Sequence, residues 1–468
     1  MKPTRPILLL TCSLLSACAT VGPNYRAPGA PELSVPASYY GAPAAPSPAD
    51  LAGWWTRLDD PLLDSIVQRA IGGNLDLAVA ESRLRQAREA VVQARAAGLP
   101  SLAASSGVRE DVAPNGHRTT TFSVGGDASW EIDLFGGIAR GVEAARAGAQ
   151  GSEYDLAAVR VSLIGDVVTS YVQARLAQQR LALERDTLAI ADENLQIATW
   201  RREAGLVSSL DVEQARGQRA QTAATIPTLE RDFSAAAYRL AVLTGQAPGA
   251  LMGELQTAQP VPNAPDEVAV GIPADTLRQR PDVRAAERTL AAETARIGVA
   301  KAQLLPGLRL TGNIGSSALS VGGLVDQITG GLFAGLTAPI FEGGRLRSQV
   351  RAQEAAAQGA LASYHQTVLN GLEDVENGLT ALTAAKQRRA DFTVALDAAN
   401  NQAILARSEY RAGLTDFQTL LEAERALLSA RDGLASSHAD QTLAFVQLYR
   451  ALGGGWQPLT TSSGIPQS

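Results

Sequence analysis

The fold is decided by a proline-free, alanine-rich stretch at residues 137–201, which reads GIARGVEAARAGAQGSEYDLAAVRVSLIGDVVTSYVQARLAQQRLALERDTLAIADENLQIATWR. A second such stretch runs from residue 344 to residue 411. At 1.5 Å per residue, each would form a helix roughly 100 Å long, whereas helices of globular proteins average about 11 to 12 residues. Apolar residues three and four positions apart mark one face of each helix: Val161, Ile164, Val168 and Tyr171, and then Val368, Leu372, Val375, Leu379 and Leu382.

Helices of this length must pack lengthwise on neighbours, and the proline positions permit it. No proline occurs between Pro114 and Pro227, or between Pro339 and Pro458. Nothing in either block therefore forces a helix to break. We predict two coiled-coil helical hairpins, at about residues 137–244 and 344–452.

Composition bounds the class of protein. With 468 residues, 46% of them apolar and 19% charged, the chain can bury large cores and is not compositionally disordered. A net charge of −6 and a pI near 5.4 argue against nucleic acid as the main partner. Both cysteines, Cys12 and Cys18, lie in the first twenty residues, so no disulfide framework supports the rest of the chain.

The N-terminus has the pattern of an export signal. Lys2 and Arg5 precede an apolar run at residues 7–15 that is too short to span a bilayer. Residues 15–18 (Leu-Ser-Ala-Cys) are similar to a bacterial lipobox, which implies a signal peptide at 1–17 and a diacylglycerol plus an N-acyl chain on Cys18. Two or more chains anchor a protein stably. The competing interpretation is an ordinary signal peptide with an incidental cysteine.

The segments outside the long helical stretches predict the domain boundaries. Residues 18–52 are rich in proline and predict a lipidated, extended tether. Asp60 and Pro61 then form a helix start, with Asp60 as the cap. We predict a first repeat at 53–247, a linker or equatorial segment at 248–273, a second repeat at 274–456 and a C-terminal tail at 457–468.

A two-residue period after Pro100 indicates strands. Apolar residues alternate with polar ones along three segments: Phe122, Val124, Ala128, Trp130, Ile132 and Leu134; Leu308, Leu310 and Ile314; and Leu332, Ala334, Leu336, Ala338 and Ile340. We predict β-hairpins at about 101–134 and 307–340, with strands long enough for the 9 to 11 residues that cross a membrane. Strand statistics alone favour a hairpin in a soluble sheet, whereas the lipid signal and the internal repeat favour the membrane.

The chain contains an internal two-fold repeat. Equivalent positions keep nearly constant offsets of 206, 206, 207 and 208 residues: Glu81 and Glu287, Pro100 and Pro306, Gly136 and Gly343, and Gly205 and Gly413. Each half would contribute one hairpin, which makes four strands per chain. Four strands cannot close a barrel, and an open edge in lipid leaves backbone groups unsatisfied. Membrane strands would therefore require an oligomer of two, three or four copies.

Several motifs in order closely resemble one family. They are Trp54-Trp55, Asp60-Pro61, Asn74-Leu75-Asp76-Leu77, Glu131–Gly137, Arg280–Glu287, Ile297–Ala300 with Pro306, and Tyr449–Trp456. This pattern resembles the NodT-type branch of the TolC-like outer membrane factors. The resemblance implies a mainly α-helical homotrimer with a twelve-stranded β-barrel in the outer membrane of a Gram-negative bacterium and an α-helical barrel in the periplasm. It also implies the exit duct of a tripartite efflux pump, with a periplasmic adaptor (membrane fusion) protein and an inner-membrane transporter of the resistance-nodulation-division (RND) type as partners.

The resemblance also places a gate at the helix reversals around Gly205 and Gly413, where a left-handed glycine suits the end of a helix. It implies a constriction formed by Gln418, Glu422 and Arg425. It further implies a latch in the reversals, formed by Arg202, Asp211, Tyr410, Arg411 and Asp416. The competing interpretation is solvated charges and i,i+3 pairs worth ~0.2 to 0.5 kcal/mol each. Relatives often carry aspartate in place of Glu422 and an apolar residue in place of Gln418, which leaves Leu414 or Leu420 as alternative plugs.

Other functions have less support. His117, His365 and His438 are isolated, and no metal, nucleophile or phosphate-loop motif accompanies them, so we predict neither an enzyme nor a metal or other cofactor site. Two alternatives remain open. One is the outer membrane channel of a type I protein secretion system; the other is a non-conducting, lipid-anchored coiled-coil structural protein.

Overall fold

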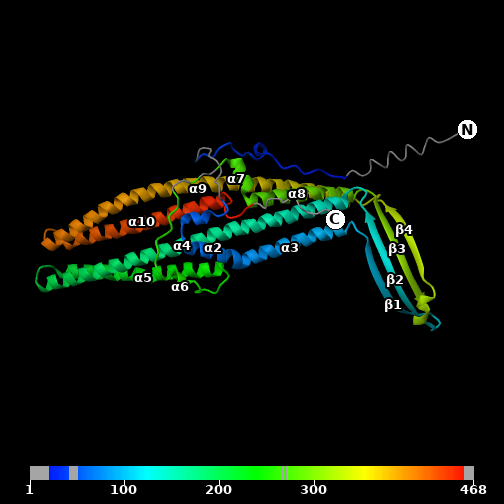
Figure 1. Ribbon diagram of the computed structural model, residues 1–468, viewed down its shortest axis with the longest axis horizontal. Helices are drawn as coiled ribbons and strands as arrows, with labels where there is room; N and C mark the ends of the chain where they lie inside the picture. The colour runs from blue at the N-terminus through cyan, green and yellow to red at the C-terminus, as the bar shows by residue number, and fades with distance from the viewer. Residues whose placement is uncertain (1–19, 42–50, 266–267, 269–270, 458–468) are drawn as a thin grey trace. The chain divides into compact units, whose positions relative to one another are not determined.

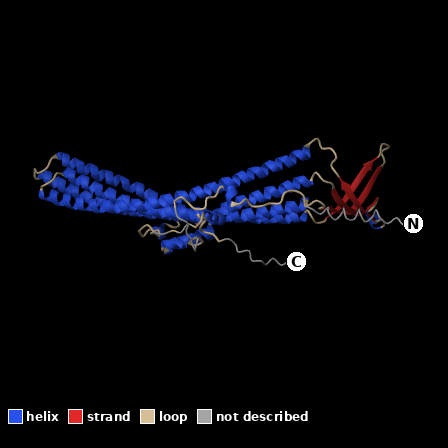
Figure 2. Cartoon of the chain, turned by 90° about the horizontal axis from the view of Figure 1, so that it is seen from above, coloured by secondary structure: helices blue, strands red, loops and turns tan. Residues whose placement is uncertain are grey.

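The computed structural model describes residues 20–41, 51–265, 268 and 271–457. The described part of the chain is mainly helical, and its strands lie in one small sheet (Figure 2). It divides into two compact units. Unit 1 contains residues 82–155 and 282–367 with the N-terminal segment up to Gly29. Unit 2 contains residues 30–81, 156–281 and 368 onward. Each unit therefore takes parts of both sequence repeats.

The sheet of unit 1 has four antiparallel strands in chain order (Figure 1). They are β1 (Ser101–Val112), β2 (Arg118–Ile132), β3 (Gly307–Ala318) and β4 (Thr329–Thr337), with a short 3-10 helix η3 (Val321–Val325) before β4. The register places Leu102, Ala128, Gly312 and Leu332 in one row across the sheet. The next row holds Ala103, Asp127, Asn313 and Gly331. Because directly paired residues share a face, apolar and polar rows alternate between the two faces.

The strands end earlier than the alternation suggests. The pattern of apolar residues extends to Leu134 and Ile340, but β2 ends at Ile132 and β4 at Thr337. Pro339 has no N–H to donate to a ladder, which explains the early end of β4. The strands β1 and β4 each pair with one neighbour only. Their outer edges are therefore unpaired within the described chain.

The helices of unit 1 hold the N-terminal segment. They are α8 (Pro281–Ala302) and parts of α3 (Leu75–Ala96), α4 (Gly137–Glu203) and α9 (Arg345–Ala412). The backbone N–H of Val21 donates to Phe135 O at 3.0 Å. Arg140 Nε donates to Val21 O at 3.1 Å, and Gly22 lies so close to Gly298 that a Cβ would clash with its backbone. The first described residues are thus fixed beside the turn between β2 and α4.

Unit 2 is built from long helices that run in pairs. Its remaining elements are η1 (Ala30–Leu33), η2 (Trp54–Leu58), α2 (Pro61–Gly73), α5 (Ser209–Leu243), α6 (Met252–Leu255), α7 (Pro273–Gln279) and α10 (Phe417–Ala451). The pairs are α4 with α5 and α9 with α10, each joined by a short reversal (Figure 1). Both predicted apolar stripes face the core: Ile164, Val168, Tyr171 and Val375 are fully buried, and Val368 is nearly so. The stripe predictions are confirmed.

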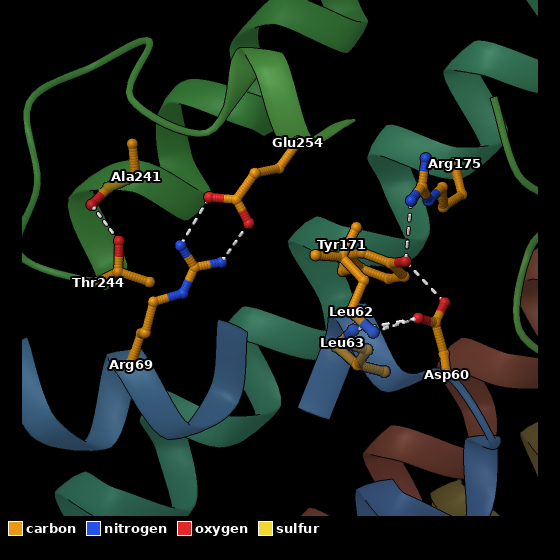
Figure 3. Close-up of polar contacts among 9 residues, drawn as sticks. All are labelled: Asp60, Leu62, Leu63, Arg69, Tyr171, Arg175, Ala241, Thr244 and Glu254. Carbon is orange, nitrogen blue, oxygen red and sulfur yellow. Dashed lines mark hydrogen bonds and ion pairs between the residues drawn. The ribbon is translucent and has the colours of Figure 1, made fainter. Parts of the chain in front are cut away.

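A polar network fixes the start of α2 against α4 (Figure 3). Asp60 accepts hydrogen bonds from the backbone N–H groups of Leu62 and Leu63 at 3.0 and 3.1 Å, as predicted for the cap. Its second oxygen accepts from the Tyr171 hydroxyl at 2.6 Å. Arg175, which is 1% exposed, donates to the same hydroxyl oxygen at 3.0 Å. Burial raises the pKa of Tyr171. The phenol therefore stays protonated and donates a hydrogen bond to Asp60.

Around the predicted linker, α6 is tied to α2 by a bidentate ion pair between Arg69 and Glu254, with both N–O distances 2.8 Å (Figure 3). The linker's residues 266–267 and 269–270 lie outside the described chain, as do Cys18 and residues 458–468. Within the described residues, no helix has the length and apolar character that a membrane span requires.

Candidate functional site

The two helix reversals of unit 2 are built alike. Gly205 and Gly413 adopt left-handed backbone angles, with φ of 75° and 72°. In the first reversal Leu206 N donates to Arg201 O at 2.8 Å, and in the second Leu414 N donates to Glu409 O at 2.9 Å. This is the bonding of a Schellman end, which satisfies the last carbonyls of a helix. The next helices begin at equivalent caps, Ser208 and Asp416.

An apolar cluster holds the reversals together. It contains Ala198, Ala215, Ala406, Tyr410, Phe417, Leu420, Leu421 and Ala423, which come from α4, α5, α9 and α10. The rings of Tyr410 and Phe417 lie 5.5 Å apart. The guanidinium of Arg201 lies 4.5 Å from the Tyr410 ring centroid and donates to Tyr410 O at 3.1 Å. Tyr410 is therefore a packed anchor, 4% exposed.

The structure does not bring the predicted latch residues together within one chain. Arg202 is exposed, and its guanidinium has no ion pair with any described residue. Asp211 accepts from the Ser208 hydroxyl at 3.4 Å. Arg411 lies 3.8 Å from Glu193, and both side chains are largely exposed. Within the chain, Tyr410 is contacted by Arg201, the residue before Arg202.

The predicted constriction residues form an exposed stripe on α10. Gln418 Nε2 donates to Glu422 Oε1 at 2.9 Å, four residues along the helix. Arg425 continues this stripe and donates from Nε to Gln218 Oε1 on α5 at 2.7 Å. All three side chains are accessible, and Arg425 also connects the two hairpins. Of the two alternative plugs, Leu414 is 80% exposed, whereas Leu420 is buried in the apolar cluster.

The sequence analysis missed a buried cross-link next to this stripe. Glu424 Oε2 accepts from Asn194 Nδ2 on α4 at 2.6 Å, and its Oε1 accepts from Arg407 Nε on α9 at 3.2 Å. Burial raises the pKa of Glu424, and the Arg407 hydrogen bond opposes that shift. A signal was present: Glu424 follows Leu420 and Leu421 at helical spacing and precedes Leu427, so a charge interrupts the apolar face.

Comparison with solved structures defines the class. The outer-membrane channel OprN superposes with a TM-score of 0.86 at 35% sequence identity, over 94% of this chain and 100% of that one. The chain thus has the fold of the TolC-like outer membrane channels, with its candidate site in the helix reversals.

Sequence comparison then gives the family. Residues 66–246 and 272–454 match the family model described as outer membrane efflux protein. Nodulation protein T of Rhizobium leguminosarum bv. trifolii is 34% identical over 467 residues, which cover 98% of this chain and 99% of the relative. The pyoverdine export outer membrane protein OpmQ of Pseudomonas aeruginosa is 32% identical, with 96% of each chain covered. The chain belongs to the outer membrane efflux protein family.

Proposed function

We propose that this chain is the outer membrane exit duct of a tripartite RND-type efflux pump, through which small molecules pass passively from the periplasm to the exterior. The observation that carries the proposal is a four-stranded sheet whose two outer edges have no strand partner among the described residues, on a chain of an efflux family. A sheet edge in lipid leaves N–H and C=O groups without partners, at a cost of several kcal/mol each. Pairing β1 of one copy with β4 of the next removes that cost.

Three copies would supply twelve strands, which is enough to close a barrel around a water-filled lumen. The same three copies would bring six helical hairpins together around a periplasmic tube. The alternating rows support this arrangement, because the Leu102–Leu332 row would face lipid and the row with Asp127 and Asn313 would face the lumen. Such alternation is what membrane β-barrels require.

The partners we propose are a periplasmic adaptor and an inner-membrane transporter of the RND type. Large apolar side chains are exposed at the reversals, and exposed apolar surface commonly marks a site of protein–protein contact. They are Trp200, Leu206, Leu210 and Leu414, with exposed fractions of 59%, 69%, 64% and 80%. We assign this surface to the adaptor. Pyoverdine export, named for the relative OpmQ, suggests a small-molecule cargo.

Gating is proposed to occur at the reversals, by separation of the helical pairs. In the closed state the apolar cluster around Tyr410 and the polar stripe with Gln418 and Glu422 would narrow the tube. Adaptor binding would favour an open state if it contacts the separated helices better than the packed ones, because only differential affinity shifts such an equilibrium. No bond is made or broken by the chain.

The N-terminus is proposed to carry lipid on Cys18. The contacts of Val21 and Gly22 with Phe135, Arg140 and Gly298 support the proposal, since they fix the chain beside the base of β2, three residues after the cysteine. Labelling cells with radioactive palmitate tests it. Wild type should incorporate label and Cys18→Ser should not; incorporation by the variant would contradict the assignment.

The duct is tested with the mature chain in detergent and in planar lipid bilayers. We expect a heat-labile trimer and discrete single-channel steps, and we expect a strain without the gene to become more susceptible to several small antibiotics. A water-soluble monomer without conductance would instead support a structural coiled-coil protein. Loss of export of one large protein, with unchanged drug susceptibility, would support type I secretion.

A further inference from the structure

Glu424 connects three helices of unit 2 about two turns after the start of α10. One carboxylate oxygen accepts from Asn194 on α4 at 2.6 Å, and the other accepts from Arg407 on α9 at 3.2 Å. The side chain is 14% exposed. The carboxyl group therefore lies where the two hairpins meet, and separation of α4 from α10 would break its contact with Asn194 and admit water.

The charges around Glu424 do not fully compensate its burial. Arg407 on α9 is the nearest cation, and it is itself about one-third exposed. Glu193 on α4 adds a repulsive negative charge, although Arg411 at 3.8 Å from Glu193 moderates it. The α5 residues nearby, Ala215 and Gln218, are uncharged. Arg425 of α10 is a second cation that lines the same cavity, but its Nε donates to Gln218 Oε1 at 2.7 Å. Burial consequently outweighs the donors, and it raises the pKa of Glu424 above the ordinary value of a glutamate.

A small cavity adjoins the carboxyl group. Its volume is about 20 Å³, and its lining includes Thr187 and Asn194 of α4, Gln218 of α5, and Glu424, Arg425 and Leu428 of α10. This volume admits one water molecule, and three of these uncharged residues supply polar atoms for it. A proton can therefore reach Glu424 while the helices remain packed.

We propose that Glu424 is a proton-sensitive lock on the reversals: protonated, it holds α4, α9 and α10 together, and ionised, it favours their separation. The inference rests on the proposed gating at the reversals. The direction of the pH dependence follows from the burial of the carboxyl group. In separated helices the carboxyl group meets water and has an ordinary pKa, so the packed state binds the proton more tightly. Packing is then favoured at low pH and loses this contribution as the pH rises through the pKa of buried Glu424.

The direct test is single-channel recording of the full mature chain between pH 5 and pH 8. We expect the open probability of wild type to rise with pH, by up to about tenfold for each unit by which the pKa values of the two states differ. Glu424→Gln is neutral at every pH, so its profile should be flat and stay at the acidic wild-type level. Glu424→Asp should keep a pH dependence. Glu213→Gln, which removes an exposed carboxylate of α5, should match wild type.

A second readout does not need conductance. A cysteine introduced by Thr187→Cys lies in the cavity and is labelled by maleimide when the helices separate. The thiol's own pH dependence cancels when the labelling rate is divided by the rate in the Thr187→Cys, Glu424→Gln double variant. We expect this ratio to rise with pH. A constant ratio overturns the lock even if the chain forms pores, whereas a rising ratio supports it even if the duct proposal fails. A wild-type conductance profile that Glu424→Gln reproduces also overturns it.

Discussion

Arg201 and Arg202 are neighbours on α4, but only Arg201 contacts Tyr410. Successive residues of a helix point about 100° apart, so a shift of one position separates a packed cation from a solvated one. Two adjacent arginines look alike in a sequence, so the one that packs on Tyr410 is identified only when the orientation of the helix is known. The cross-link made by Glu424 was not predicted for a related reason, because its partner Asn194 is 230 residues away along the chain.

The Arg201 contact makes a residue-scale prediction. Arg201→Ala removes a cation–π contact and a hydrogen bond, which together should contribute about 1 kcal/mol at this partly exposed site. Amide hydrogen exchange in residues 410–414 should therefore become roughly fivefold faster, because local opening becomes easier. Arg202→Ala is the matched control and should leave these rates unchanged. Equal acceleration in the two variants would show that Arg201 has no special role in the reversal.

At the scale of elements, local sequence signals were sufficient for much of the fold. Asp60 caps α2, the glycines at the two reversals adopt φ near 75°, and the apolar stripes of α4 and α9 are buried. These features depend on residues a few positions apart, so a single sequence reveals them. Strand ends are harder, because they depend on which N–H groups find partners across the sheet, and β4 ends before Pro339.

The reversals make an element-scale prediction. Gly413 has φ of 72°, where a Cβ costs roughly 1–2 kcal/mol. Gly413→Ala should therefore destabilise the second reversal by about that amount and lower the thermal unfolding midpoint of the oligomer. Gly217 lies within α5 with open space around it, and Gly217→Ala should instead stabilise by about 0.5–1 kcal/mol. Differential scanning calorimetry distinguishes the two. A midpoint unchanged by Gly413→Ala would contradict the strain argument.

At the scale of the whole molecule, the sequence predicted the order of elements but not how they combine. Each compact unit takes segments from both repeats, so the repeat boundary at residues 248–273 does not divide the fold into its units. Compact units depend on contacts between residues 150 or more apart, such as Phe122 with Ala318 in the sheet. The number of copies in the oligomer is still harder to predict from one sequence, because it depends on how sheet edges of different chains pair.

The proposed barrel predicts opposite effects for the two faces of the sheet. Leu332 is 94% exposed in the apolar row with Leu102 and Gly312, whereas Asn313 lies one position along, in the polar row with Asp127. Leu332→Arg would place a charge in lipid at a cost of about 2–4 kcal/mol near the bilayer midplane, so the amount of heat-labile oligomer in the outer membrane fraction should fall sharply. Asn313→Arg adds the same charge to the lumen face, where water solvates it, and assembly should be preserved. Equal assembly of both variants would mean that the apolar row does not contact lipid.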